Sequence, residues 1–180
     1  MPNNDQLRFL DDEFFTLTLM ATTQRTKLYM ATAKDPERDS ARKALRAALS
    51  TLTPAYGRQV SDSEHGANIE GLAKGLTAEH ASALRGGHFR IGLAQKALNL
   101  HLKYMWCLNR VVMPPHCPLD AFVLDHIPGC SDVKWTQMDS LPEYQELISR
   151  ARKVAGDEPL AVWELRLWSL TKRNSASPRT

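Results

Sequence analysis

Apolar side chains recur at steps of three and four residues along most of the chain, a spacing typical of amphipathic helices. Such stretches lie at residues 7–33, 39–52, 91–108, 118–127, 142–156 and 159–171, and two shorter helices are expected between 69 and 87. No run of alternating apolar and polar residues is long enough to predict a strand. The pattern therefore predicts an all-α fold, a compact single-domain helical bundle.

Several boundaries depend on one or two residues. Asp35-Pro36 is expected to end the first helical stretch, which forms one long helix or two short ones. Thr77 is expected to cap a separate short helix that closes at Gly86-Gly87. We place the domain at residues 1–171 and predict a polar, weakly basic tail at 172–180.

Residues 91–108 are apolar on nearly all sides. The polar exceptions are Gln95, Lys96, Asn99, His101 and Lys103. A helix of this composition usually lies at the centre of a fold, so we expect this stretch to be buried.

Length and charge narrow the class of protein without selecting one. The chain has 180 residues, with 23 Lys plus Arg against 20 Asp plus Glu, for a net charge of +3. A chain of this length buries roughly 70% of the surface that its unfolded form exposes, so one core is expected. No apolar stretch reaches the ~18 residues that span a bilayer, and we expect no membrane association and no export. The charge permits a nucleic-acid partner without requiring one.

Three cysteines, Cys107, Cys117 and Cys130, cannot all pair within one chain, which favours a reducing, cytoplasmic location. With His116 and His126 they supply soft metal ligands, but the spacing lacks a C-x-x-C pair and fits no common zinc module. The chain has no P-loop and no dinucleotide-binding glycine motif. We expect neither a metal nor a cofactor.

The sharpest chemical signal is a lysine followed by a carboxylate. Lys96 lies early in the buried stretch, where a lysine loses hydration and its neutral, nucleophilic form is favoured. Asp120 is expected in the first turn of the next helix, where the helix dipole favours an ionised carboxylate. The proline-rich connection can fold Asp120 back toward Lys96. This pair is suited to Schiff-base chemistry at a sugar carbon that becomes cationic.

A structural interpretation of the same residues stays open. Lys96 and Asp120 also fit a structural ion pair, or two side chains that reach solvent separately. Likewise, tryptophans in helices more often belong to the core than to a binding site, and this applies most strongly to Trp106.

The sequence resembles a known enzyme family at three places. Residues 95–105, with QKALNL followed by KYM, and the later Pro118-Leu119-Asp120 resemble the lysine helix and P-x-D segment of helix-hairpin-helix DNA glycosylases. The similarity is nearest to the archaeal-type 8-oxoguanine DNA glycosylases. Glu164, with Trp168 four residues later, resembles the last helix of that family. Gln24 resembles its N-terminal base-contacting glutamine.

The resemblance implies a DNA glycosylase, with or without AP-lyase activity, and DNA as the partner. In it, Lys96 is the nucleophile and Asp120 the essential carboxylate. Gln24, Glu164 and Trp168 line the pocket for a flipped base, with Trp163 as a second stacking candidate. If this is correct, Lys96 and Asp120 border one pocket with Trp168 on its wall.

Cations beside a glycine turn supply candidates for the DNA backbone. Arg85, His88 and Arg90 flank Gly86-Gly87, and cations near exposed backbone N–H groups are suited to a phosphate. A solvated loop is the alternative for this turn. For the whole protein, the alternative is a non-catalytic helical module that binds DNA or another protein.

Overall fold

Helix α4 (Ile91–Cys107) is the centre of the fold, as its apolar composition predicts, and 12 of its 17 residues are buried. The computed structural model describes residues 3–176, with side chains to residue 170. Within that part it has seven α-helices, three short 3₁₀ turns and no strand, so the predicted all-α class is confirmed. None of the helices in the described part is both long and apolar enough to cross a membrane.

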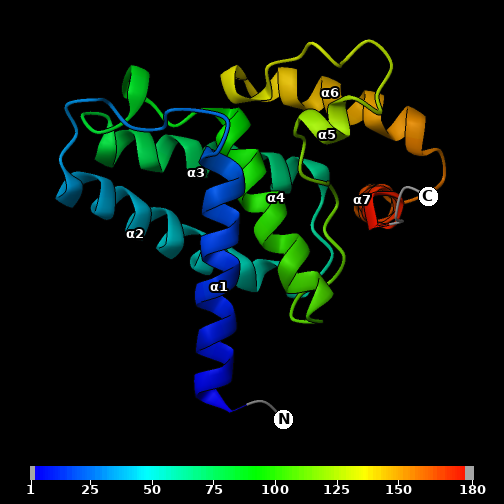
Figure 1. Ribbon diagram of the computed structural model, residues 1–180, viewed down its shortest axis with the longest axis horizontal. Coiled ribbons are helices and arrows are strands. Elements are labelled where there is room, and N and C mark those ends of the chain that lie inside the picture. Colours follow the sequence, from blue (N-terminus) through cyan, green and yellow to red (C-terminus); the bar gives the residue numbers. More distant parts are fainter. Residues whose placement is uncertain (1–2, 177–180) are drawn as a thin grey trace.

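Six further helices surround α4 (Figure 1). They are α1 (Asn4–Thr23), α2 (Asp35–Leu52), α3 (Asp62–His80), α5 (Ala121–Leu124), α6 (Leu141–Ala155) and α7 (Leu160–Ala176). The 3₁₀ turns are η1 (Thr53–Gly57), η2 (Arg85–Gly87) and η3 (Trp135–Gln137). Helix α1 packs beside α4, and its N-terminal half extends beyond the other helices (Figure 1). Helix α2 lies on one side of α4, α3 passes behind α4, and α5–α7 lie on the side opposite α2 (Figure 1).

Local chemistry explains where several helices begin and end. The Ser140 hydroxyl accepts a hydrogen bond from the Glu143 N–H, which caps α6, and Pro142 occupies its first turn, where a missing N–H does no harm. Gly156 ends the same helix with a positive φ of 63°. Asp120 caps α5, because its side chain accepts from the Val123 N–H at 3.1 Å.

Several predicted boundaries are wrong, and the stretch predicted at 118–127 contains only the four residues of α5. Helix α1 ends at Thr23, ten residues before the predicted end, and Asp35-Pro36 begins α2 instead of only ending what precedes it. Proline fits there because the first turn of a helix has no carbonyl partner for its N–H. Helix α7 continues through Ala176, into the segment predicted as a tail, and residues 177–180 lie outside the described residues.

Thr77 is not a helix cap. It lies inside α3, which is one continuous helix rather than two short ones. The Thr77 hydroxyl donates to the Ala73 carbonyl at 2.7 Å and accepts from the Phe89 N–H at 2.9 Å. Thr77 therefore joins the segment before α4 to α3. In the sequence, this tertiary role has the same local pattern as a helix cap.

Gly92 fixes the first turn of α4 against η3. A Cβ at this position would lie 1.7 Å from the Trp135 carbonyl oxygen, so no other residue fits without a backbone shift. The Gly92 N–H donates to the Met138 carbonyl at 2.9 Å. This close approach sets the position of the turn of α4 that carries Lys96.

A buried hydrogen-bond network joins α3, α4 and α6. We call it the histidine network, and its members are Tyr56, His65, Gln95, Asn99, His116 and Tyr144, each no more than 2% exposed. Asn99 lies at the centre, accepting from His65 Nε2 at 2.9 Å and donating to the Tyr144 hydroxyl at 3.0 Å. At the surface the network ends where His116 Nε2 meets Asp62, which is paired with Arg152.

Burial keeps both histidines of the network neutral. It lowers the pKa of His65 to about 3 and that of His116 to about 4. The carboxylate and amide partners fix each neutral ring with a proton on Nε2, so that Nδ1 accepts from Tyr56 in one case and from Tyr144 in the other. The network therefore supplies hydrogen-bond partners to the buried polar groups of the core, and its members carry no charge.

Candidate active site

Lys96 and Asp120 meet in a close ion pair, with Lys96 Nζ 2.5 Å from Asp120 Oδ2. Lys96 comes from the second turn of α4, and its side chain is 7% exposed. Asp120 comes from the cap of α5, and its side chain is 27% exposed. The amine is therefore withdrawn from water while its carboxylate partner keeps an open side.

Gln95 holds the Asp120 segment against α4. Its side-chain amide donates to the Leu119 carbonyl at 2.6 Å, and its side-chain oxygen accepts from the Leu119 N–H at 3.1 Å. These two bonds fix the backbone directly before Asp120. The proline-rich connection does fold back as predicted, but its position depends on Gln95, which the sequence analysis places only among the polar exceptions of this helix.

A second lysine–carboxylate pair lies on the same face of α4. Lys103, seven residues after Lys96, binds both carboxylate oxygens of Glu164, at 2.9 and 2.6 Å. The two side chains are 12% and 7% exposed. The Lys103 ammonium also lies 5.7 Å from the centre of the Trp168 ring. Lys103 is not among the site residues predicted from the sequence, although its seven-residue spacing from Lys96 is the signal that places both on one helix face.

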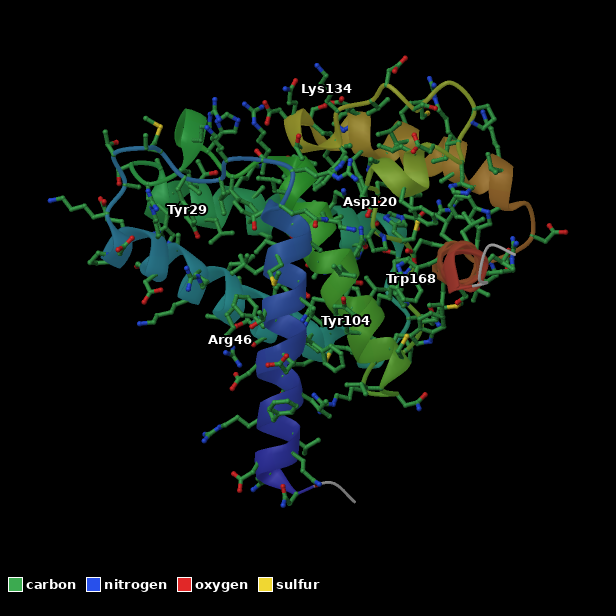
Figure 2. The ribbon with its side chains drawn as sticks, in the orientation of Figure 1. Tyr29, Arg46, Tyr104, Asp120, Lys134 and Trp168 are labelled. Atoms are coloured by element: carbon green, nitrogen blue, oxygen red, sulfur yellow. The ribbon has the colours of Figure 1, made fainter. Side chains whose placement is uncertain are left out.

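Both pairs line one pocket of about 500 Å³. Gln24 and Trp168 also line it, so the five residues that the sequence indicates for nucleophile, carboxylate and base contacts come together. The rest of the wall is mainly apolar and comes from α1, α4, α5 and α7: Ala21, Leu100, Tyr104, Cys107, Phe122 and Leu165. Figure 2 labels three of the lining residues, Tyr104, Asp120 and Trp168, which come from three different elements.

This arrangement combines the parts that nucleophilic substitution at a sugar needs. The pocket holds an amine, a partly open carboxylate and an aromatic side chain, Trp168, that is 48% exposed. Burial raises the pKa of the Tyr104 hydroxyl, so this lining residue stays neutral. The pocket is large enough for a planar heterocycle and apolar enough to stack one.

The predicted phosphate-binding residues lie in a neighbouring groove. Arg85, His88 and Arg90 line a cavity of about 880 Å³, and Gln24 lines both this groove and the Lys96 pocket. His88 Nε2 lies 3.1 Å from Asp139, and Arg90 is also paired with Asp139. Two of the three residues are thus held by one carboxylate.

Cys107 lines the pocket, whereas the other candidates from the sequence lie away from it. Trp163 is 3% exposed and belongs to the core, so it cannot stack on a ligand. Trp106 packs against the core from a partly buried position. Cys117 and Cys130 are buried, whereas Cys107 is exposed, and in the described part of the chain all three are free thiols. No group of three or more His, Cys, Asp or Glu in that part is arranged to hold a metal ion.

Comparisons with protein families, with curated proteins and with solved structures found no match for this chain.

Proposed function

We propose that this protein is a DNA glycosylase that removes a damaged or modified base through a Schiff base at Lys96. The observation that carries the proposal is the pocket in which Lys96, Asp120 and Trp168 converge. Residues between 21 and 168 contribute to it from four helices and a turn. The resemblance of the sequence to helix-hairpin-helix DNA glycosylases assigns a role to each of these three. Free thiols agree with a reducing, cytoplasmic setting for such an enzyme.

The proposed reaction begins with a nucleotide turned out of the DNA stack. Its base enters the pocket and stacks on Trp168, while Lys103 and Glu164 offer polar contacts at its edge. This brings the anomeric carbon toward Lys96 and Asp120. Positioning of both groups before the reaction supplies much of the acceleration expected for such a site.

The covalent step exchanges one bond at the anomeric carbon for another. The bond to the base breaks, and the base leaves with its electron pair and takes up the proton that the Lys96 ammonium passes to it through Asp120, while the freed Lys96 amine forms a bond to the carbon. The Asp120 carboxylate stabilises the positive charge that develops on the sugar and accepts the proton that Lys96 loses. Opening of the sugar ring then gives a Schiff base, which either hydrolyses or proceeds to strand cleavage.

Borohydride trapping tests this proposal, because borohydride reduces the Schiff base to a stable amine that joins protein and DNA. The substrates are duplex and single-stranded DNA carrying a panel of base lesions. We expect a covalent complex with the wild type and none with Lys96→Gln, which keeps side-chain length and polarity but removes the amine. Lys74→Gln removes an exposed lysine on α3 and serves as the matched control. Absence of trapping across the panel, with DNA binding intact, would contradict the proposal.

The alternative function is a non-catalytic helical module that binds DNA or protein. The 2.5 Å contact between Lys96 and Asp120 favours it, because a purely structural ion pair has the same geometry. Thermal melts of Lys96→Gln and Asp120→Asn separate the two functions. A structural pair predicts that each change destabilises by roughly 3–5 kcal/mol, since the partner stays buried and unpaired. Melting close to that of the wild type agrees with an open catalytic pair.

A further inference from the structure

The groove beside the Lys96 pocket is built by two distant segments of the chain. The loop after α1 and the segment before η2 are joined by an antiparallel bridge between Tyr29 and Leu84. The Arg85 N–H donates to the Leu28 carbonyl, and the Met30 N–H donates to the Ala83 carbonyl, both at 2.9 Å. These bonds hold the side chains at 25–27 and at 85 on the rim of one groove.

Three cations on this rim are available to a ligand. Arg25, Lys27 and Arg85 are exposed and line the groove. No ion pair or side-chain hydrogen bond involves any of them within the part of the chain whose side chains are described. None of the residues that line the groove is acidic. The rim therefore carries uncompensated positive charge, which attracts polyanions.

The other two cationic groups of the groove are engaged within the protein. Arg90 binds both Asp139 and the Gln137 carbonyl, and His88 binds Asp139 and the Gly86 carbonyl. These contacts join the start of α4 to the loop before α6. Because His88 and Arg90 are already bonded within the protein, they attract a ligand less strongly than the three rim cations do.

Gln24 connects the groove with the site of chemistry. It follows the last residue of α1, its N–H donates to the Met20 carbonyl at 2.9 Å, and it lines both the groove and the Lys96 pocket. The groove and the Lys96 pocket are therefore neighbours that share Gln24 as a lining residue.

We propose that this groove seats the DNA phosphates next to the extruded nucleotide, with Arg25, Lys27 and Arg85 as the phosphate contacts. This proposal rests on the proposed function. It extends that function because it adds the loop after α1 to the glycine turn as a source of DNA-backbone contacts. Three cations on one rim match the regular charge of a nucleic-acid strand, and each contact releases counterions into solution. His88 and Arg90 serve chiefly to hold the groove wall in place.

The test uses a short duplex with a tetrahydrofuran abasic analogue, which binds but cannot form a Schiff base. Fluorescence anisotropy at a series of salt concentrations gives the slope of log affinity against log salt. Arg25→Gln, Lys27→Gln and Arg85→Gln are each expected to flatten the slope by about 0.9, the value for one lost contact in duplex DNA. Lys43→Gln, an exposed lysine on α2 that does not line the groove, is the matched control and should leave the slope unchanged.

The outcomes separate this inference from the proposed function. If the slope becomes flatter in the three rim variants and not in the control, the groove is supported as the phosphate site, whether or not borohydride traps the wild type. Unchanged slopes in all three variants would overturn the groove as the phosphate site, and trapping would still decide the enzymatic proposal. Absence of salt-dependent DNA binding by the wild type, or tighter binding of an RNA duplex of the same sequence, would also overturn it.

Discussion

Helix α4 carries two kinds of polar site next to each other along one buried helix. Gln95 and Asn99 belong to the histidine network, whereas Lys96 and Lys103 face the pocket. The histidine network is neutral and closed, with every member at most 2% exposed. The pocket is charged and open, with the Asp120 side chain 27% exposed beside a cavity of about 500 Å³.

This difference in charge and exposure distinguishes polar groups that stabilise the fold from polar groups that can contact a ligand. A buried polar group costs free energy unless it is hydrogen-bonded, and the network meets this condition through protein partners. In the pocket, a lysine and a carboxylate are bonded to each other while the carboxylate still faces a cavity. A ligand can therefore exchange contacts with the pocket pair, but not with the network.

Among single substitutions in the pocket, the largest expected effect on stability comes from the more buried of the two pocket pairs. Glu164→Gln leaves the Lys103 ammonium, 12% exposed, without its charged partner, and we expect a loss of about 3–5 kcal/mol in the free energy of unfolding. Urea denaturation measures this loss. The double variant Lys103→Met with Glu164→Leu should recover most of it, because it removes both charges. If Glu164→Gln is as stable as the wild type, Lys103 and Glu164 are not shielded from solvent.

Asp120→Asn is expected to act on the rate rather than on the fold. Asparagine can still cap α5 through its side-chain oxygen, but it carries no charge to stabilise a cationic sugar. We expect single-turnover base excision to slow by on the order of 10²-fold, which corresponds to about 2.7 kcal/mol. An excision rate equal to that of the wild type would remove Asp120 from the proposed mechanism.

A separate effect concerns pH and the histidine network. His65 and His116 are neutral in the fold, with pKa values lowered to about 3 and about 4, and ordinary in the unfolded chain. Between about pH 6.5 and 4 the unfolded chain binds more protons, so stability should fall as the pH decreases, by up to about 1.4 kcal/mol per pH unit for each histidine.

Urea denaturation at several pH values in this window measures that slope. The nearby Asp62 carboxylate does not reverse the trend, because pairing with Arg152 lowers its pKa to about 2 and its own contribution is lost only below the usual range of an aspartate. A flat stability profile between pH 6.5 and 4 would show that the two rings are not neutral in the fold.

The sequence alone determined the fold class and the central helix. The three- and four-residue spacing of apolar positions reports directly on helical periodicity, so residues 91–108 were predicted within one residue of α4. Both ends of the predicted stretch 142–156 fall within one residue of α6, where Ser140 and Gly156 satisfy backbone groups locally. Thr77 misled for the same reason, since the hydroxyl of a capping residue also suits a tertiary hydrogen bond.

Only the tertiary structure decided which polar residues meet. Lys96 and Asp120 are 24 residues apart, and their contact depends on the two Gln95 bonds to Leu119 and on the close approach that Gly92 permits. The pairing of Lys103 with Glu164, and the rim formed by Arg25, Lys27 and Arg85, join segments still farther apart. Periodicity and capping are local properties of the chain, whereas such contacts depend on how helices pack against each other, which no spacing within one helix encodes.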